Sequence, residues 1–152
     1  MILTHTRFGN IEFTAEDIIT FEGGLIGFGD STEFLMVPSK PGSPFSWLQS
    51  AQDPSLAFLT TDPAAFFEDY DPEISDHDAA QLGLTSGADF GIFVTSAIPV
   101  GEPRKATANL AAPILINLDT KRGKQVVLDN EAYTMRHPIF SEQSAPVQKL
   151  AA

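Results

Sequence analysis

The sequence predicts a mostly β fold: a small single-domain antiparallel β-barrel or rolled sheet with one or two short helices. Apolar and polar residues alternate with a period of two in about ten short segments, which is typical of strands. Gly, Pro, Asp and Asn separate these segments at short intervals, and a single segment carries clear helix start and stop signals. A chain of 152 residues, 43% of them hydrophobic, is long enough to build one core of its own.

The N-terminal region predicts a meander of short antiparallel strands. Ile2–Thr6 and Asn10–Thr14 alternate around a turn at Phe8–Asn10, and Asp17–Phe21 is a further apolar run. The glycine-rich stretch Phe21–Asp30 lacks the Lys-Ser/Thr ending of a phosphate loop and the glycine spacing of a dinucleotide fingerprint, and its acids would repel phosphate. We therefore expect a structural turn in which glycines adopt positive φ.

The central region predicts strands and two helix starts. Asp62-Pro63 has the N-cap and first-turn residues of a short helix, which Asp71-Pro72 would end. Ser75 and Asp78 resemble a capping box, and Gly83 is placed to end that helix. The helix dipole favours acids in its first turn, which gives Asp76 and Asp78 a structural role. The strands expected before these helices are Phe34–Val37, Phe45–Ser50 and Leu56–Thr61.

The C-terminal region predicts further strands, of which Phe90–Pro99 is so continuously apolar that we expect cover on both faces. Asp119–Gly123 predicts a hairpin turn with its left-handed residue at Gly123. Asn130–Met135 is expected as a last strand or short helix. The other expected strands are Thr107–Leu110, Pro113–Leu118 and Gln125–Leu128, with Ile114, Ile116, Leu118, Val126 and Leu128 facing inward.

The expected domain organisation is a β-rich domain at residues 1–140 and a flexible polar tail at 141–152, whose last four residues have the character of a vector remnant. No apolar run is long enough to span a membrane, and the chain has no Cys, which suits a cytoplasmic location.

The net charge of −11 is concentrated in the first hundred residues, which hold fifteen acids and two bases. Proteins bind nucleic acid largely by neutralising phosphates with cations, so this chain would repel nucleic acid and anionic membranes. A basic protein is its natural electrostatic partner, and acidity that serves only solubility is the alternative.

Between Pro41 and Pro103 the chain has no Lys or Arg but ten Asp or Glu. Apolar residues such as Phe66 and Phe67 are interleaved with these acids, as in an interface with an apolar centre and a charged rim. The alternative is that the two Phe side chains are core and the acids form a solvated loop. Six of the acids fall in one run: Glu68, Asp69, Asp71, Glu73, Asp76 and Asp78. The predicted partner-binding residues are Glu68, Asp69, Tyr70, Asp71 and Glu73.

Catalytic and metal-binding patterns are weak. His5, His77 and His137 lie in separate elements, and the acids after Glu68 lack the Gly and Glu that a calcium loop needs. We expect no metal, no cofactor and no enzymatic activity. Two alternatives stay open: an acidic β-barrel enzyme that acts on carbohydrate through two converging carboxylates, and a structural subunit that self-associates through an apolar surface.

An ordered set of short motifs runs along residues 2–140. They are Phe8-Gly9, Phe21-x-x-Gly24-Leu25-x-Gly27-Phe28, Pro44-Phe45-x-Trp47-Leu48-Gln49-Ser50, Leu56-Ala57-Phe58, Asp62-Pro63, Asp69-Tyr70, Asn109-Leu110-x-Ala112-Pro113-Ile114, Gln125 and Tyr133. In this order they closely resemble the flagellar assembly factor FliW family. The resemblance implies a cytoplasmic, non-enzymatic, β-rich protein that is monomeric when free. It also implies that the protein binds flagellin and, once released, sequesters the RNA-binding translational repressor CsrA, so that flagellin translation is de-repressed.

Overall fold

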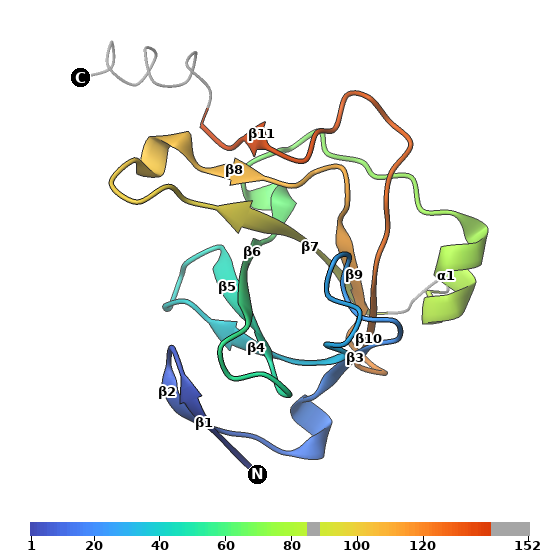
Figure 1. The fold of residues 1–152 in the computed structure, drawn as a ribbon. Coiled ribbons are helices and arrows are strands. Elements are labelled where there is room, and N and C mark those ends of the chain that lie inside the picture. The colour runs from blue at the N-terminus through green and yellow to red at the C-terminus, as the bar shows by residue number, and fades with distance from the viewer. Residues whose placement is uncertain (85–88, 141–152) are drawn as a thin grey trace.

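The computed structural model describes residues 1–84 and 89–140, and its main feature is a closed β-barrel (Figure 1). One sheet has the strand order β11-β8-β7-β6-β5-β4-β3-β10-β9, and a further pairing of β7 with β9 closes seven of the strands into a ring. All pairings are antiparallel except that of β10 with β3. The predicted mostly β barrel is confirmed. The strands of the ring are β3 (Ile19–Phe21), β4 (Glu33–Pro38), β5 (Phe45–Ser50), β6 (Ala57–Thr61), β7 (Phe90–Ala97), β9 (Ile114–Asn117) and β10 (Arg122–Gln125).

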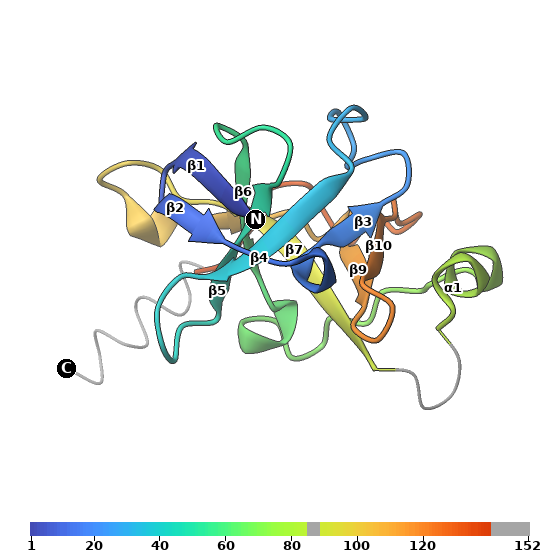
Figure 2. The same cartoon turned by 90° about the horizontal axis from the view of Figure 1, so that it is seen from below.

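The N-terminal hairpin of β1 (Ile2–Thr6) and β2 (Gly9–Glu12) forms a separate two-stranded sheet. It lies beside β5, where the Phe8 ring packs 5.7 Å from the Trp47 ring (Figure 2). The predicted N-terminal meander is therefore only partly right. A 3₁₀-helix, η1 (Ala15–Asp17), turns the chain after the hairpin, and β3 pairs with β4 and β10 instead.

The barrel interior is filled by side chains that are almost fully buried. The Phe21 and Phe34 rings pack edge to face at 5.5 Å, and a Cβ on Gly123 would lie 2.4 Å from the Phe21 ring. Gly123 thus permits close packing inside β10. The prediction that Gly123 is the left-handed turn residue is wrong, because Lys121 holds that position with φ 59°. The other members of this core are Ile19, Leu25, Leu48, Ile114 and Ile116.

The strand β10 starts earlier than predicted, because the turn before it is tighter. Its ladder with β9 ends at Gln125, opposite Ile114, so the expected strand Gln125–Leu128 is wrong. Val126 is buried beyond the ladder, whereas Leu118 is exposed and does not face the core.

The glycine-rich stretch forms the predicted structural turn. Gly23, Gly24 and Gly27 all adopt positive φ, and a Cβ on Gly24 would lie 2.4 Å from the carbonyl oxygen of Phe28. The side chain of Gln125 accepts a hydrogen bond from the Ile26 amide at 2.9 Å, which ties the turn to the end of β10.

Both predicted helix starts are confirmed. Asp62 caps a single 3₁₀ turn, η2 (Pro63–Ala65), by accepting a hydrogen bond from the Ala64 amide at 2.9 Å. Ser75 caps the helix α1 (Asp76–Leu82), and Gly83 ends it in the left-handed conformation with φ 65°. The helix lies outside the barrel beside β10 (Figure 1).

The region from Phe90 onward differs from the prediction in three further places. Phe90 is 43% exposed, so β7 is not covered on both faces along its whole length. The strand β8 (Thr107–Ala108) is shorter than expected, and a short 3₁₀-helix, η3 (Pro103–Lys105), precedes it. The segment 130–135 is neither strand nor helix, and it leads into β11 (His137–Pro138), which pairs with β8. The tail predicted at 141–152 lies outside the described residues.

Across residues 1–84 and 89–140, no helix has the length and apolar character that crossing a membrane would require.

Candidate functional site

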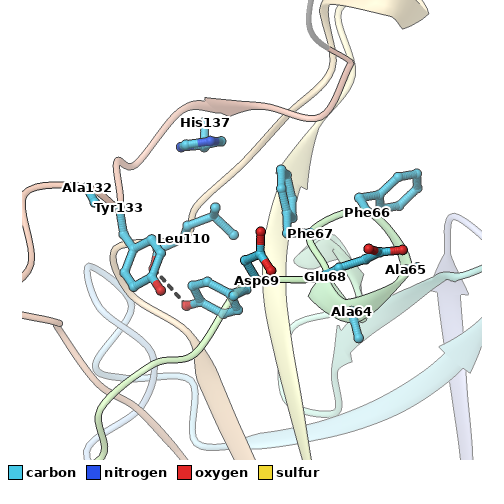
Figure 3. A pocket seen from close by; sticks show the side chains of 11 residues that line it. Ala64, Ala65, Phe66, Phe67, Glu68, Asp69, Leu110, Ala132, Tyr133 and His137 are labelled. Atoms are coloured by element: carbon cyan, nitrogen blue, oxygen red, sulfur yellow. Dashed lines mark hydrogen bonds between the residues drawn. The ribbon is translucent and has the colours of Figure 1, made fainter. Parts of the chain in front are cut away.

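An open groove of about 520 Å³ lies between the segment that follows β6 and the segment that leads into β11 (Figure 3). Its first wall is Ala64–Tyr70, and its second wall is formed by Ala132, Tyr133 and His137, with Leu110 between them. Three of the five predicted partner-binding residues line this groove: Glu68, Asp69 and Tyr70. Asp71 and Glu73 are exposed farther along the same segment and do not line it.

A tight turn presents the two carboxylates of the groove to solvent. The Tyr70 amide donates a hydrogen bond to the Phe67 carbonyl oxygen at 3.1 Å, which places Glu68 and Asp69 at the two middle positions of the turn. Both residues are exposed. In a turn of this kind the middle side chains point away from the closing hydrogen bond, so the local backbone keeps these acids out of the core.

Tyr70 has a structural role in the groove wall. Its hydroxyl donates a hydrogen bond to the Leu110 carbonyl oxygen at 2.7 Å, and its ring packs edge to face with that of Tyr133 at 4.8 Å. Burial raises the pKa of the Tyr70 phenol well above its ordinary value of 10.0. The Tyr133 hydroxyl accepts a hydrogen bond from the Asp71 amide at 3.1 Å, so the two tyrosines join the two walls.

The two interpretations of the adjacent Phe66 and Phe67 are core residues and part of a binding surface, and the structure agrees with both. Each is half-buried and packs against the core cluster that contains Val94 and Leu110. Each also lines the groove, and the Phe67 ring meets the His137 ring edge to face at 5.4 Å. The core therefore holds these two aromatic side chains of the groove wall in place.

Residues 66–73 form the groove segment. Its four acids have no ionic partner among the described residues. The three ion pairs there join Lys105 to Glu102, Arg122 to Glu22 and Lys124 to Asp78. No hydrogen bond to a side-chain oxygen of Glu68, Asp69, Asp71 or Glu73 is present in the same residues. These four carboxylates are therefore available to an external cation.

Four groove residues escaped sequence reasoning: Leu110, Ala132, Tyr133 and His137. They lie forty or more residues from Tyr70 along the chain. Leu110 follows β8, and the pairing of β11 with β8 brings Ala132, Tyr133 and His137 to the groove. Leu110 and Tyr133 carry the one available signal, since both belong to the ordered motifs that resemble the FliW family. No linear pattern distinguishes His137 from the exposed His77.

Two further kinds of chemistry gain no support from the groove. Within residues 1–84 and 89–140, no three His, Asp or Glu side chains are close enough together to hold a metal ion. Glu68 and Asp69 do share the groove, but both are solvent-exposed and neighbours in one turn. A glycosidase pair instead faces its substrate from two sides, with one carboxyl group in an apolar environment.

Comparison with known proteins places the chain in a family. The sequence profile of the FliW protein family matches residues 2–139. A flagellar assembly factor FliW from Natranaerobius thermophilus is 41% identical over 143 residues, which cover 94% of this chain and 95% of that protein. Its counterpart from Syntrophotalea carbinolica is 40% identical over 134 residues, which cover 88% of this chain and 94% of that protein. A crystal structure of the flagellar assembly factor FliW superposes with a TM-score of 0.85 at 34% identity, covering 94% of this chain and 99% of that chain. The chain belongs to the FliW protein family.

Proposed function

We propose that this protein is a cytoplasmic flagellar assembly factor that acts by binding flagellin and the translational repressor CsrA. The flagellar role is supported by the two relatives described above. Both are flagellar assembly factors, and this chain matches each of them over nearly its whole length. The two partners follow from the family resemblance of the sequence. In this proposal, flagellin occupies the factor until secretion depletes it, and the free factor then captures CsrA and releases flagellin translation.

The observation that carries the protein-binding function is the set of unpaired carboxylates beside an aromatic groove. An unpaired surface carboxylate contributes little to folding, whereas a cation from a partner gives it an ion pair and steers association. Buried aromatic anchors with a polar rim are the usual composition of a binding surface. The groove segment has both features within Phe66–Glu73.

The charge of the whole molecule supports CsrA as a partner. An RNA-binding repressor carries cations, and a protein of net charge −11 bound beside them opposes RNA through its negative field. This protein itself then needs no contact with nucleic acid or with a membrane.

The test is a calorimetric titration of purified CsrA and flagellin into two charge-reversed variants. One carries Lys in place of Glu68, Asp69 and Asp71, and the other carries Lys in place of Glu12, Glu16 and Asp30. The control acids are exposed and unpaired in the described structure, and both variants change the net charge by the same amount.

We expect the groove variant to bind CsrA at least about tenfold more weakly, with a flatter salt dependence, and the control variant to stay within about threefold of the wild type. Equal losses in both variants would show that only net charge matters. If the groove variant binds both partners with unchanged affinity, the groove segment is not part of the interface.

A further inference from the structure

We propose that the groove contains a slot for one arginine side chain of a bound protein segment, with Asp69 as its ionic partner and aromatic rings as its walls. This inference rests on the proposed function, because it specifies what the same groove recognises in a partner. Asp69 lies in the middle of the turn, and Figure 3 shows its carboxylate in the view between the rings of Tyr133 and Phe67. Glu68, beside Asp69 in the turn, adds a second negative charge at the rim.

The composition of the groove favours a guanidinium group over other ligands. A guanidinium is planar, binds a carboxylate with two parallel hydrogen bonds and stacks on aromatic faces, and it is more weakly hydrated than an ammonium. The groove offers exposed carboxylates and four Phe and Tyr rings beside His137, and no Lys or Arg is among its described lining residues. A negatively charged ligand would meet the carboxylates of Glu68 and Asp69 and no Lys or Arg among the described residues that line the groove, and a purely apolar ligand would leave the carboxylates unpaired. The aromatic side chains are Phe66, Phe67, Tyr70 and Tyr133.

The same chain already contains a guanidinium stacked on an aromatic ring. Arg7 lies with its guanidinium carbon 4.0 Å from the centre of the Trp47 ring. Contact of a guanidinium with an aromatic face is favourable even at an exposed site. Arg7 forms no ion pair within the described part of the chain, whereas the groove adds carboxylates to an aromatic surface of this kind.

The walls of the slot are fixed before any ligand arrives. The hydroxyl groups of Tyr70 and Tyr133 are held by Leu110 and Asp71, and the Phe67 ring is held against His137. A ligand therefore does not have to order the aromatic side chains, which lowers the entropy lost on binding. Only the exposed carboxylates need to adjust.

The test uses two short peptides and nuclear magnetic resonance of the whole isotope-labelled protein. The probe is acetyl-Leu-Arg-Leu-amide, and its control is acetyl-Leu-citrulline-Leu-amide, which has nearly the same shape without the charge. We expect saturable amide shifts at the groove turn and at Tyr133, with a dissociation constant of order 1 mM for the arginine peptide and binding about tenfold weaker for the citrulline peptide. Asp69→Asn is expected to weaken binding of the arginine peptide by a similar factor. Asp30→Asn, at an exposed acid outside the groove, is expected to leave the binding of this peptide unchanged.

Equal binding of the two peptides, or the absence of saturable groove shifts up to about 20 mM peptide, would overturn the slot. The proposed function is separately tested with CsrA and flagellin. If the wild type binds these proteins and Asp69→Asn binds them equally well, the slot is wrong and the proposed function stands. If the wild type binds neither protein, the proposed function is wrong whatever the peptides do.

Discussion

Two groups of acids lie within eleven residues of this chain, and the fold uses them in opposite ways. Asp76 and Asp78 occupy the first turn of α1, where the Asp78 carboxylate accepts a hydrogen bond from the Ser75 hydroxyl and pairs with Lys124 at 2.5 Å. Glu68 and Asp69 stand in an exposed turn and meet no cation among the described residues. Composition alone makes the two groups look alike, whereas the helix-capping pattern and the contacts separate acids that support the fold from acids that can bind a partner.

The helix acids follow a familiar structural logic. Negative charge in a first turn is stabilised by the helix dipole, and Lys124 of β10 ties the helix to the barrel. Leu82 packs with Leu115 and Val126 behind this ion pair. The groove acids have no comparable support. Acids that do not stabilise the fold are therefore the better candidates for contact with a partner.

The largest predicted effect on stability is that of Asp78→Ala, which removes the ion pair and the bond to Ser75. We expect a loss of about 2 kcal/mol in the free energy of unfolding, because a charge-assisted hydrogen bond of a partly buried group is lost and Lys124 keeps only Gln81. Urea denaturation measures it. A double-mutant cycle with Lys124→Met is expected to give a coupling of at least about 0.5 kcal/mol. A purely additive cycle would contradict the importance of the pair.

The next largest effect is predicted at Tyr70. This residue lies in the groove segment, but its contacts with Leu110 and Tyr133 make it part of the folded framework. Tyr70→Phe removes the hydrogen bond to the Leu110 carbonyl oxygen and leaves that acceptor without its partner. We expect a loss of about 1 kcal/mol in urea denaturation. Tyr133→Phe is the matched control, and we expect a smaller loss because water can replace its bond to the exposed Asp71 amide. Equal losses would mean that leaving the Leu110 carbonyl oxygen without its partner costs no more than leaving the exposed Asp71 amide without its partner.

The pH dependence of stability tests how much the negative charge of Asp78 contributes to the free energy of unfolding. Its hydrogen bond from the Lys124 ammonium lowers the pKa of this carboxyl below the ordinary value of 3.8. A carboxyl group with a lowered folded pKa stabilises the protein above its unfolded pKa and loses that contribution as the pH falls through the folded pKa. The stability difference between the wild type and Asp78→Asn is therefore expected to be constant above about pH 5 and to shrink in more acidic solution. A difference that stays constant down to pH 3 would contradict the ion pair.

Sequence reasoning succeeded where the determining interactions are local. The caps of η2 and α1 and the positive-φ glycines at positions 23, 24 and 27 depend on neighbours within a few residues, and all were predicted. It failed where the tertiary structure decides. A glycine in a hairpin suggests a turn position for Gly123, yet the ring of Phe21, its partner on the neighbouring strand β3, requires the glycine.

The groove shows the same division. Its acidic wall was predicted because the residues from Phe66 to Glu73 are continuous in sequence. Its second wall was not, since the pairing of β11 with β8 brings Tyr133 and His137 to this place. Such a two-residue ladder has no recognisable pattern in the sequence.

The smallest predicted effect on stability is at the groove acids themselves. Glu68→Gln and Asp69→Asn together are expected to change the free energy of unfolding by no more than about 0.5 kcal/mol, because neither side chain is buried or paired in the described structure. Removing two like charges from an acidic segment relieves repulsion, so any change is expected to be stabilising. Urea denaturation at low and high salt measures both the size and the sign, since salt screens that repulsion and is expected to reduce the gain. A loss comparable to that of Asp78→Ala would mean that these acids support the fold, and the contrast between the two groups would then no longer identify a binding surface.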